Sequence, residues 1–189
     1  MTTETIDDII KAVIKLSMRK QIKFNNGHLK VLQISDLQDN RFTCVDTLRF
    51  MEAAVKKIKP DLIVFTGDQL DVVDLWGKGE RCRSNVEKAI NRLFSVFESF
   101  NIPFVLTFGN HDRETGLPNE EQAKIYAKMK NCICFDDVND GRPDAGTFNV
   151  PIMSSDGSRT AMNIYVFDTG SKPNGVYGGV RKEQLEWLD

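Results

Sequence analysis

Three short apolar runs, each ending in polar residues, predict the buried strands of an α/β sheet. The runs are Leu29 to Ile34, Leu62 to Thr66 and Ile102 to Phe108. The second and third runs are apolar almost throughout, which is typical of strands that are covered on both faces. The polar residues that follow them then mark one edge of the sheet.

Two helices are expected between these strands. The first runs from Thr43 to Ile58. Its apolar positions are Val45, Leu48, Phe50, Met51, Ala54, Val55 and Ile58. The second starts near Ser84, a candidate N-cap with Glu87 at the capping-box position, and ends near Ser99. Strand, helix, strand, helix, strand predicts an α/β fold with a mostly parallel sheet flanked by helices.

The flanking parts of the chain predict smaller elements. An amphipathic helix is expected over 5–19 and a turn at Asn25-Asn26-Gly27, so 1–27 is interpreted as an N-terminal helical extension of a domain over 28–189. After the third strand, the patterns predict a helix from Pro118 to Lys130, a short strand from Cys132 to Phe135, a hairpin of Thr147–Ile152 with Ala161–Asp168, and a helix that starts after Val180.

Composition narrows the class of protein. A chain of 189 residues, 41% apolar and 28% charged, has the make-up of one globular domain. A net charge of -2 gives no reason to expect nucleic acid as a partner, and no apolar stretch is long enough to span a membrane. The four cysteines form no CxxC pair, so reduced thiols and a cytoplasmic protein are expected.

The polar ends of the three strands carry the candidate chemistry. Asp36 follows the first strand, Asp68 the second, and Asn110 with His111 the third. Parallel strands joined by right-handed crossovers place these ends at one edge, where α/β proteins bind ligands. Carboxylate and amide oxygens suit divalent cations such as Mn²⁺, Mg²⁺ or iron. A carboxylate shared by two such ions supports hydrolysis of phosphate esters by a metal-activated hydroxide, and Asp68 is best placed for it.

These residues form an ordered set of motifs. The set resembles the first three motifs of the calcineurin-like metallophosphoesterases. In order along the chain, the motifs are Asp36-Leu37-Gln38, Gly67-Asp68-Gln69-Leu70-Asp71 and Gly109-Asn110-His111-Asp112. The segment Lys59 to Gln69 is especially similar to bacterial members and to the purple-acid-phosphatase-like branch. The resemblance covers roughly 28–189. It implies half of an α/β/β/α sandwich.

The resemblance also implies roles for single residues. Asp36 would bind the first metal ion, Asp68 would bridge two, and Asn110 would bind the second. The ions would be Mn²⁺, Fe²⁺ or Fe³⁺, or Zn²⁺. His111 would protonate the leaving oxygen of a phosphate-ester substrate, and Asp71 would orient its imidazole. Asp112 is interpreted as a structural cap or a partner of these residues.

Two departures from the family pattern weaken the expected site. Gln38 stands where the family usually has a histidine metal ligand, and an amide oxygen is a weaker donor. The family's later metal-binding histidines have no counterpart, since His28 and His111 are the only histidines. The chain therefore looks like the N-terminal portion of a longer phosphoesterase. We expect it to bind metal weakly, to be nearly inactive alone, and to self-associate through exposed apolar surface.

Three functions remain open at this level. The first is a phosphomonoesterase acting on a phosphoprotein or a small ester. The second is a nucleotide phosphodiesterase. The third is a non-catalytic binding or scaffold module with the same fold.

Overall fold

The structure, a computed structural model, describes residues 21–71, 76–135, 141–171 and 175–188. The helix expected over 5–19 lies outside the described residues. Among the helices that are described, none is both long and apolar enough to cross a membrane.

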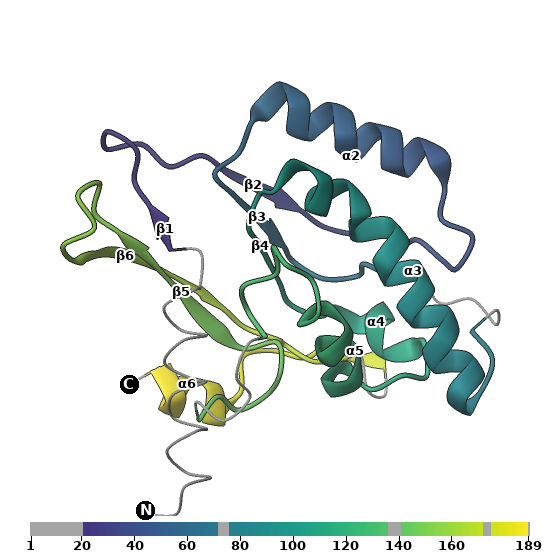
Figure 1. The fold of residues 1–189 in the computed structure, drawn as a ribbon. Coiled ribbons are helices and arrows are strands. Elements are labelled where there is room, and N and C mark those ends of the chain that lie inside the picture. Colours follow the sequence, from purple (N-terminus) through teal and green to yellow (C-terminus); the bar gives the residue numbers. More distant parts are fainter. Residues whose placement is uncertain (1–20, 72–75, 136–140, 172–174, 189) are drawn as a thin grey trace, which may run out of the picture.

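A parallel three-stranded sheet stands at the centre of the fold, in the order β2-β3-β4. Its strands are β2 (Val31–Ile34), β3 (Leu62–Phe65) and β4 (Phe104–Leu106). The registers Ile34↔Phe65 and Phe65↔Leu106 align the carboxyl ends of all three. The predicted parallel sheet is therefore confirmed, and the three polar segments leave it on one side (Figure 1). β3 and β4 are buried at every position as predicted, whereas β2 alternates between exposed and half-buried positions, so its prediction as a buried strand is wrong.

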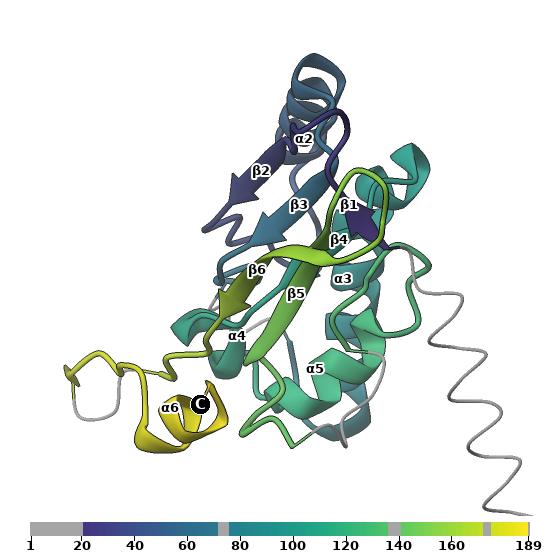
Figure 2. The same ribbon diagram turned by 90° about the vertical axis from the view of Figure 1, so that its left-hand side faces the viewer.

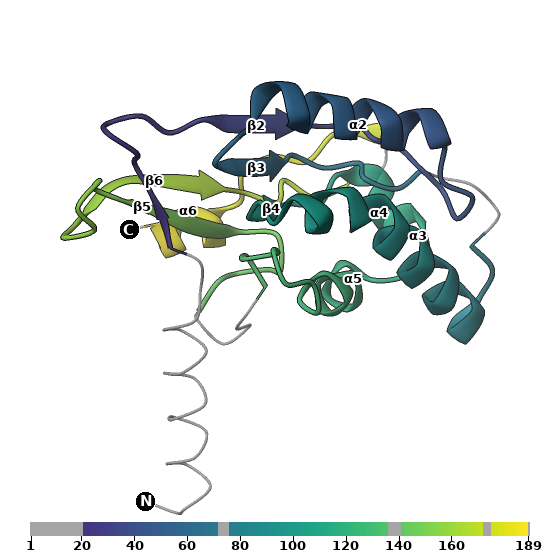
Figure 3. The same ribbon diagram turned by 45° about the horizontal axis from the view of Figure 1, so that its top comes forward.

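Two helices cover one face of this sheet: α2 (Val45–Ile58) and α3 (Gly79–Phe100) (Figure 3). Side chains alternate between the faces of a strand, so one set of positions faces these helices. Phe65 packs against Phe94 and Phe97 of α3, and Phe104 against Phe94, with ring centroids 4.8, 4.9 and 5.2 Å apart. Burial of these aromatic rings anchors the sheet to α3.

A second sheet, ordered β1-β5-β6, lies on the other side of the first (Figure 2). Its strands are β1 (Ile22–Lys23), β5 (Phe148–Met153) and β6 (Thr160–Val166). The pair β5–β6 is the predicted antiparallel hairpin, and β1 runs parallel to β5. The two sheets with helices on the outer face confirm the expected α/β layered architecture. β1 falls inside the stretch interpreted as an N-terminal extension.

Three short helices complete the described chain. They are α4 (Asn110–Glu114), α5 (Asn119–Tyr126) and α6 (Lys182–Leu188). The expected helices after Pro118 and Val180 correspond to α5 and α6, although α5 ends four residues before Lys130. The sequence did not predict α4, because five residues are too few to show a helical period.

Several expected details are wrong. The helix α3 begins at Gly79 with Lys78 as N-cap, so Ser84 lies inside it rather than capping it. Residues 132–135 are not a strand, although Cys132 forms one parallel bridge with Phe104. On α2, Phe50 is 73% exposed and Val45 50% exposed, whereas Met51 and Val55 are buried.

The four cysteines are free thiols, as expected.

Candidate active site at the strand ends

The loop after β2 runs beside the loop after β3 and is tied to it by the backbone. The N–H of Asp36 donates to the Gly67 carbonyl (3.1 Å) and that of Gln38 to the Asp68 carbonyl (2.9 Å). The pairing continues to a parallel bridge between Asp39 and Leu70. Asp36 and Gln38 are thus held next to Asp68, as the sequence predicted from their position at the strand ends.

Three of these loop residues adopt a backbone that side chains rarely tolerate. The φ angles are +55° at Asp36, +43° at Gln38 and +53° at Asp68. A positive φ costs a non-glycine residue free energy, and such residues gather at functional sites. The hydrogen bonds between the loops hold the backbone of these residues in this conformation.

The end of β4 approaches Asp68 so closely that only glycine fits. A Cβ on Gly109 would lie 2.0 Å from Oδ1 and 2.5 Å from the backbone N of Asp68. A Cβ on Gly67, whose φ is +114°, would lie 2.7 Å from the N of Gly109. These two glycines bring the second and third motifs into contact.

The side chain of Asp112 connects the loop after β3 to the end of β4. Its carboxylate is fully buried and accepts three backbone N–H groups, from Asp68 (2.9 Å), Leu70 (3.0 Å) and Gly109 (2.8 Å). Burial raises the pKa of Asp112 to about 7, although these backbone donors act to lower it. Asp112 therefore works as the structural partner that the sequence suggested.

His111 lies at the start of α4 and is hydrogen-bonded to Asp68. Its backbone N–H donates to Oδ1 of Asp68 (2.8 Å), and its ring Nδ1 lies 2.8 Å from Oε2 of Glu114. Burial acts to lower the pKa of His111, but the hydrogen bond of Glu114 and the charges of Asp68, Glu114 and Asp71 outweigh it and raise the pKa.

Glu114 is a partner that the sequence reading did not name, since it assigned the orientation of the ring to Asp71. Asp71 acts on His111 through its charge. The spacing His-x-x-Glu was the available signal, because residues three apart meet on one face of a helix.

The residues at these strand ends carry donor atoms of the kind that divalent cations prefer. Asp36 and Asp68 offer carboxylates, and Gln38 and Asn110 offer amide oxygens, all hard ligands. Across the described part of the chain, no group of three or more His, Cys, Asp or Glu residues is clustered so that it could hold a metal ion. The amide oxygens would thus have to complete each ligand set, which makes the set weak.

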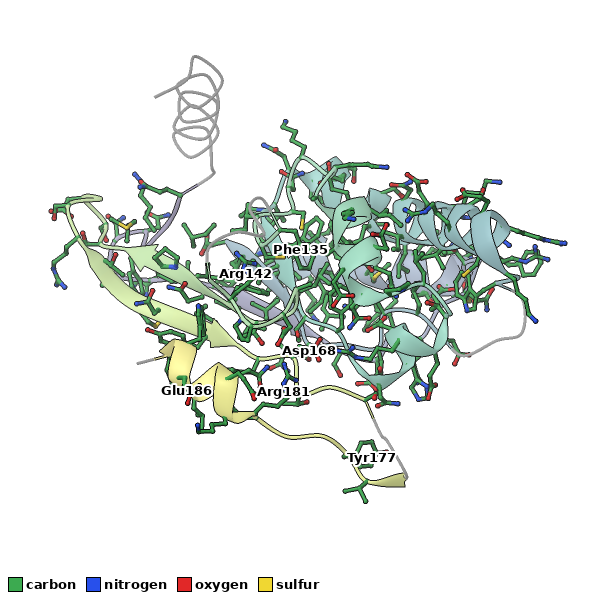
Figure 4. All side chains as sticks on the ribbon, turned by 90° about the horizontal axis from the view of Figure 1, so that it is seen from below. Phe135, Arg142, Asp168, Tyr177, Arg181 and Glu186 are labelled. Atoms are coloured by element: carbon green, nitrogen blue, oxygen red, sulfur yellow. The ribbon has the colours of Figure 1, made fainter. Side chains whose placement is uncertain are left out.

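A second polar cluster connects α4 to the end of β6. The buried Asp168 accepts hydrogen bonds from Arg113 (2.7 Å) and Asn119 (3.3 Å). Arg181, at the start of α6, donates to the Asp168 carbonyl (3.0 Å), and Figure 4 shows the two residues side by side. Arg181 also pairs with Asp144. Arg113 is therefore held by Asp168 in the structure.

Comparisons with known proteins agree with this geometry. The model of the calcineurin-like phosphoesterase family matches residues 29–188. Among similar proteins is the Arabidopsis thaliana "Probable inactive purple acid phosphatase 14", which is 30% identical over 90% of this chain and 48% of its own length. Another is "Probable inactive purple acid phosphatase 29" of the same plant, 27% identical over 92% of this chain and 50% of its own.

A bacterial relative covers a shorter stretch. The Chlamydia muridarum "UDP-2,3-diacylglucosamine pyrophosphatase LpxG" is 33% identical over 59% of this chain and 31% of its own length. No solved structure matches. The chain spans about half the length of the first curated relatives it matches. The matched range contains the ends of all three parallel strands and every residue of the candidate site. The chain belongs to the calcineurin-like phosphoesterase family.

Proposed function

We propose that the protein takes part in hydrolysis of phosphate esters, and that this chain supplies one side of a two-metal active site. Asp36, Gln38, Asp68 and Asn110 would hold two divalent cations, of which Mn²⁺, iron and Zn²⁺ are the candidates. When bound, these ions supply an activated water and neutralise charge on the phosphoryl group. The remaining work falls to protein side chains.

One observation carries the proposal: the ends of three strands meet at Asp68. Its carbonyl accepts the N–H of Gln38, its own N–H donates to Asp112, and its Oδ1 accepts the N–H of His111. The backbone at each strand end is therefore held at a fixed place relative to Asp68. A site that positions groups in this way lowers the entropy cost of reaction.

His111 is the general acid in this proposal. An alkoxide is a poor leaving group unless it receives a proton as the P–O bond breaks. The raised pKa of His111 keeps the imidazolium form populated closer to neutral pH, with the Glu114 hydrogen bond and the Asp68 charge as causes that outweigh burial. Asp71 adds to the same field.

This chain alone should bind metal weakly and turn over slowly, because amide oxygens have to complete its ligand sets. The test is a titration of the chain with Mn²⁺ by calorimetry, together with an assay of an aryl phosphate. We expect weak binding that Asp68→Asn removes, and slow hydrolysis at most. Robust turnover by the chain with Mn²⁺, or unchanged Mn²⁺ affinity in Asp68→Asn, would contradict the proposal.

A second function is supported by one comparison. The Chlamydia relative is named as a pyrophosphatase of a UDP-linked substrate, so hydrolysis of a nucleotide-linked diester or pyrophosphate is the alternative substrate class. A third, non-catalytic role is favoured by the two plant relatives, whose names call them probably inactive. Parallel assays of an aryl monoester, an aryl diester and a UDP-sugar with Mn²⁺ separate the two hydrolytic functions, and Mn²⁺ affinity that Asp68→Asn leaves unchanged would favour the non-catalytic role.

A further inference from the structure

We infer that Glu114 is a positioning residue for His111: it accepts the Nδ1 proton of the imidazole and thereby fixes which ring nitrogen is left for substrate. The inference rests on the proposed function only where it concerns the reaction. The contact itself, Nδ1 to Oε2 at 2.8 Å, is a property of the described chain.

The chemistry of the pair sets the direction of the hydrogen bond. An ionised carboxylate only accepts hydrogen bonds, so the hydrogen between the two atoms belongs to Nδ1. In a neutral imidazole this leaves Nε2 without a proton. The two nitrogens lie on different sides of the five-membered ring, so Nε2 is directed away from Glu114.

The backbone around the pair is held firmly, so this contact differs from a fluctuating surface ion pair. The N–H of His111 is bound to Oδ1 of Asp68, and Asp112 fixes the start of α4 through Gly109. The threonine at the end of the helix, Thr115, is buried and donates through Oγ1 to the Asp112 carbonyl (2.9 Å). His111 and Glu114 are thus presented on one face of a short helix whose two ends are fixed.

The imidazole of His111 is partly exposed to solvent, so its tautomer depends on the partner of Nδ1. The side chains of His111 and Glu114 are 32% and 46% exposed, so water reaches the ring. Without a partner on Nδ1, nothing among the contacts described above would select the Nδ1–H form of the imidazole. Glu114 is the group that selects it.

The consequence for the reaction follows from proton balance. As the oxygen of a water molecule bonds to phosphorus and that water gives up a proton, the bond from phosphorus to the leaving oxygen breaks. The leaving oxygen keeps the electron pair and takes the proton from Nε2 of the imidazolium. The products are an alcohol and a neutral imidazole. The imidazole keeps its proton on Nδ1, which still donates a hydrogen bond to Glu114. A proton from water then restores Nε2–H. Glu114 holds one orientation and one tautomer through this cycle.

The first test observes the tautomer directly. The chain has two histidines, so long-range ¹⁵N–¹H spectra of the labelled chain contain two rings, and His28→Gln assigns them. At about pH 9 an ordinary imidazole is neutral. We expect His111 to carry its proton on Nδ1, and Glu114→Ala to shift it to Nε2.

Glu52→Ala is the matched control. It removes a glutamate of the same charge from an ordinary helical ion pair, Glu52 with Lys56 on α2. This control should leave the His111 spectrum unchanged. A wild-type His111 that carries its proton on Nε2, or an Nδ1–H form that survives in Glu114→Ala, would overturn the inference.

The second test separates positioning from a structural role. With Mn²⁺, Glu114→Ala should lower kcat about tenfold or more for an alkyl phosphate, whose leaving oxygen needs a proton. It should change kcat little for p-nitrophenyl phosphate, whose leaving group does not, and leave KM unchanged. Equal losses on both esters would contradict the inference. Mn²⁺ affinity that Asp68→Asn leaves unchanged, with the expected tautomers in the first test, would overturn the proposed function and keep Glu114 as the residue that positions His111.

Discussion

Gly109 is the residue where the end of β4 comes closest to the loop that carries Asp68. In Gly109→Ala the new methyl group would lie 2.0 Å from Oδ1 of Asp68 and 2.5 Å from its backbone N. The Asp68 loop therefore has to move, and the hydrogen bond from His111 to Oδ1 is lost with it. We expect Mn²⁺ affinity to fall at least to the level of Asp68→Asn, measured by calorimetry.

Gly179→Ala is the control for this substitution. A Cβ at Gly179 meets no atom within 4 Å. This variant should bind Mn²⁺ as the wild type does. Equal Mn²⁺ affinity in Gly109→Ala and Gly179→Ala would show that the close approach at Gly109 has no part in forming the metal site.

Asp168 gives the molecule a pH dependence whose sign follows from its environment. Burial raises the pKa of Asp168, and this outweighs the lowering effect of the Arg113 guanidinium. The folded chain therefore binds this proton more tightly than the unfolded chain does. The stabilising contribution is complete below the unfolded pKa of about 3.9, and it is lost as pH rises through the folded pKa.

Asp168→Asn tests that sign, because asparagine has a similar shape and does not titrate. The free energy of unfolding of the wild type, measured by urea denaturation from pH 3.5 to 7, should decrease relative to that of Asp168→Asn as the pH rises. A difference that is flat or that increases with pH would mean that the Arg113 charge determines the pKa.

At the scale of elements, α2 shows that an apolar residue in a helical pattern need not be buried. Met51 is 1% exposed and Phe50, its neighbour, 73% exposed. Met51→Ala should lower the free energy of unfolding by about 2–5 kcal/mol, because it leaves a cavity under the helix. Phe50→Ala should change it by no more than about 0.5 kcal/mol. Urea denaturation of both variants checks this, and equal losses would place Phe50 in the core.

The same helix shows what a single sequence can predict. The apolar residues of α2 occupy more than one face, so the pattern indicated a helix but not which face packs. The strands were predicted more securely, since Leu62 to Phe65 is apolar at every position and buried at every position. The predicted start of α3 was wrong because the N-cap residue, Lys78, makes no side-chain hydrogen bond to the helix. No capping signal in the sequence therefore marks the true boundary.

Some features of the candidate site were likewise predicted from the sequence, and others were not. Strand ends located Asp36, Asp68, Asn110 and His111, because the topology of parallel strands brings such residues to one edge. The contacts of Glu114 and the clash distances at Gly109 depend on the short helix α4, which the sequence pattern did not reveal. Local geometry of this kind appears only when the backbone path is known.

On the scale of the whole molecule, polar contacts join the second sheet to the site. Gln184 of α6 is fully buried, and its Nε2 donates to Thr147 Oγ1 and to the Asp168 carbonyl, both at 2.7 Å. Asp168 in turn holds Arg113, two residues after His111. Arg113 of α4 is thus held by a residue more than fifty positions further along the chain, which in turn contacts α6.

The strand β6 leaves one edge of the second sheet unpaired within the described residues. Its outer residues include Met162, 40% exposed, and Tyr165, 45% exposed. Beside it runs a groove of about 390 Å³ between the sheets, lined in part by Val31, Val64 and Ile164. The segment Thr160 to Val166 carries no lysine and no proline, two of the devices that keep an exposed edge from pairing with another chain. A register shift between Ile152 and Met153 of β5 marks a β-bulge near the start of β6, which leaves the rest of the strand regular.

We therefore expect this chain to self-associate as its concentration rises, through pairing at the β6 edge. Met162→Lys places a charge on that edge and should shift the distribution toward monomer in sedimentation velocity experiments, because pairing would bury an unpaired ammonium group. Phe50→Lys introduces the same charge on the outer face of α2, on the other side of the central sheet (Figure 1), and should leave association unchanged. If both lysines reduce association equally, net charge governs it and the β6 edge does not. A chain that stays monomeric at all concentrations would contradict the expectation and show that β6 is protected without lysine or proline.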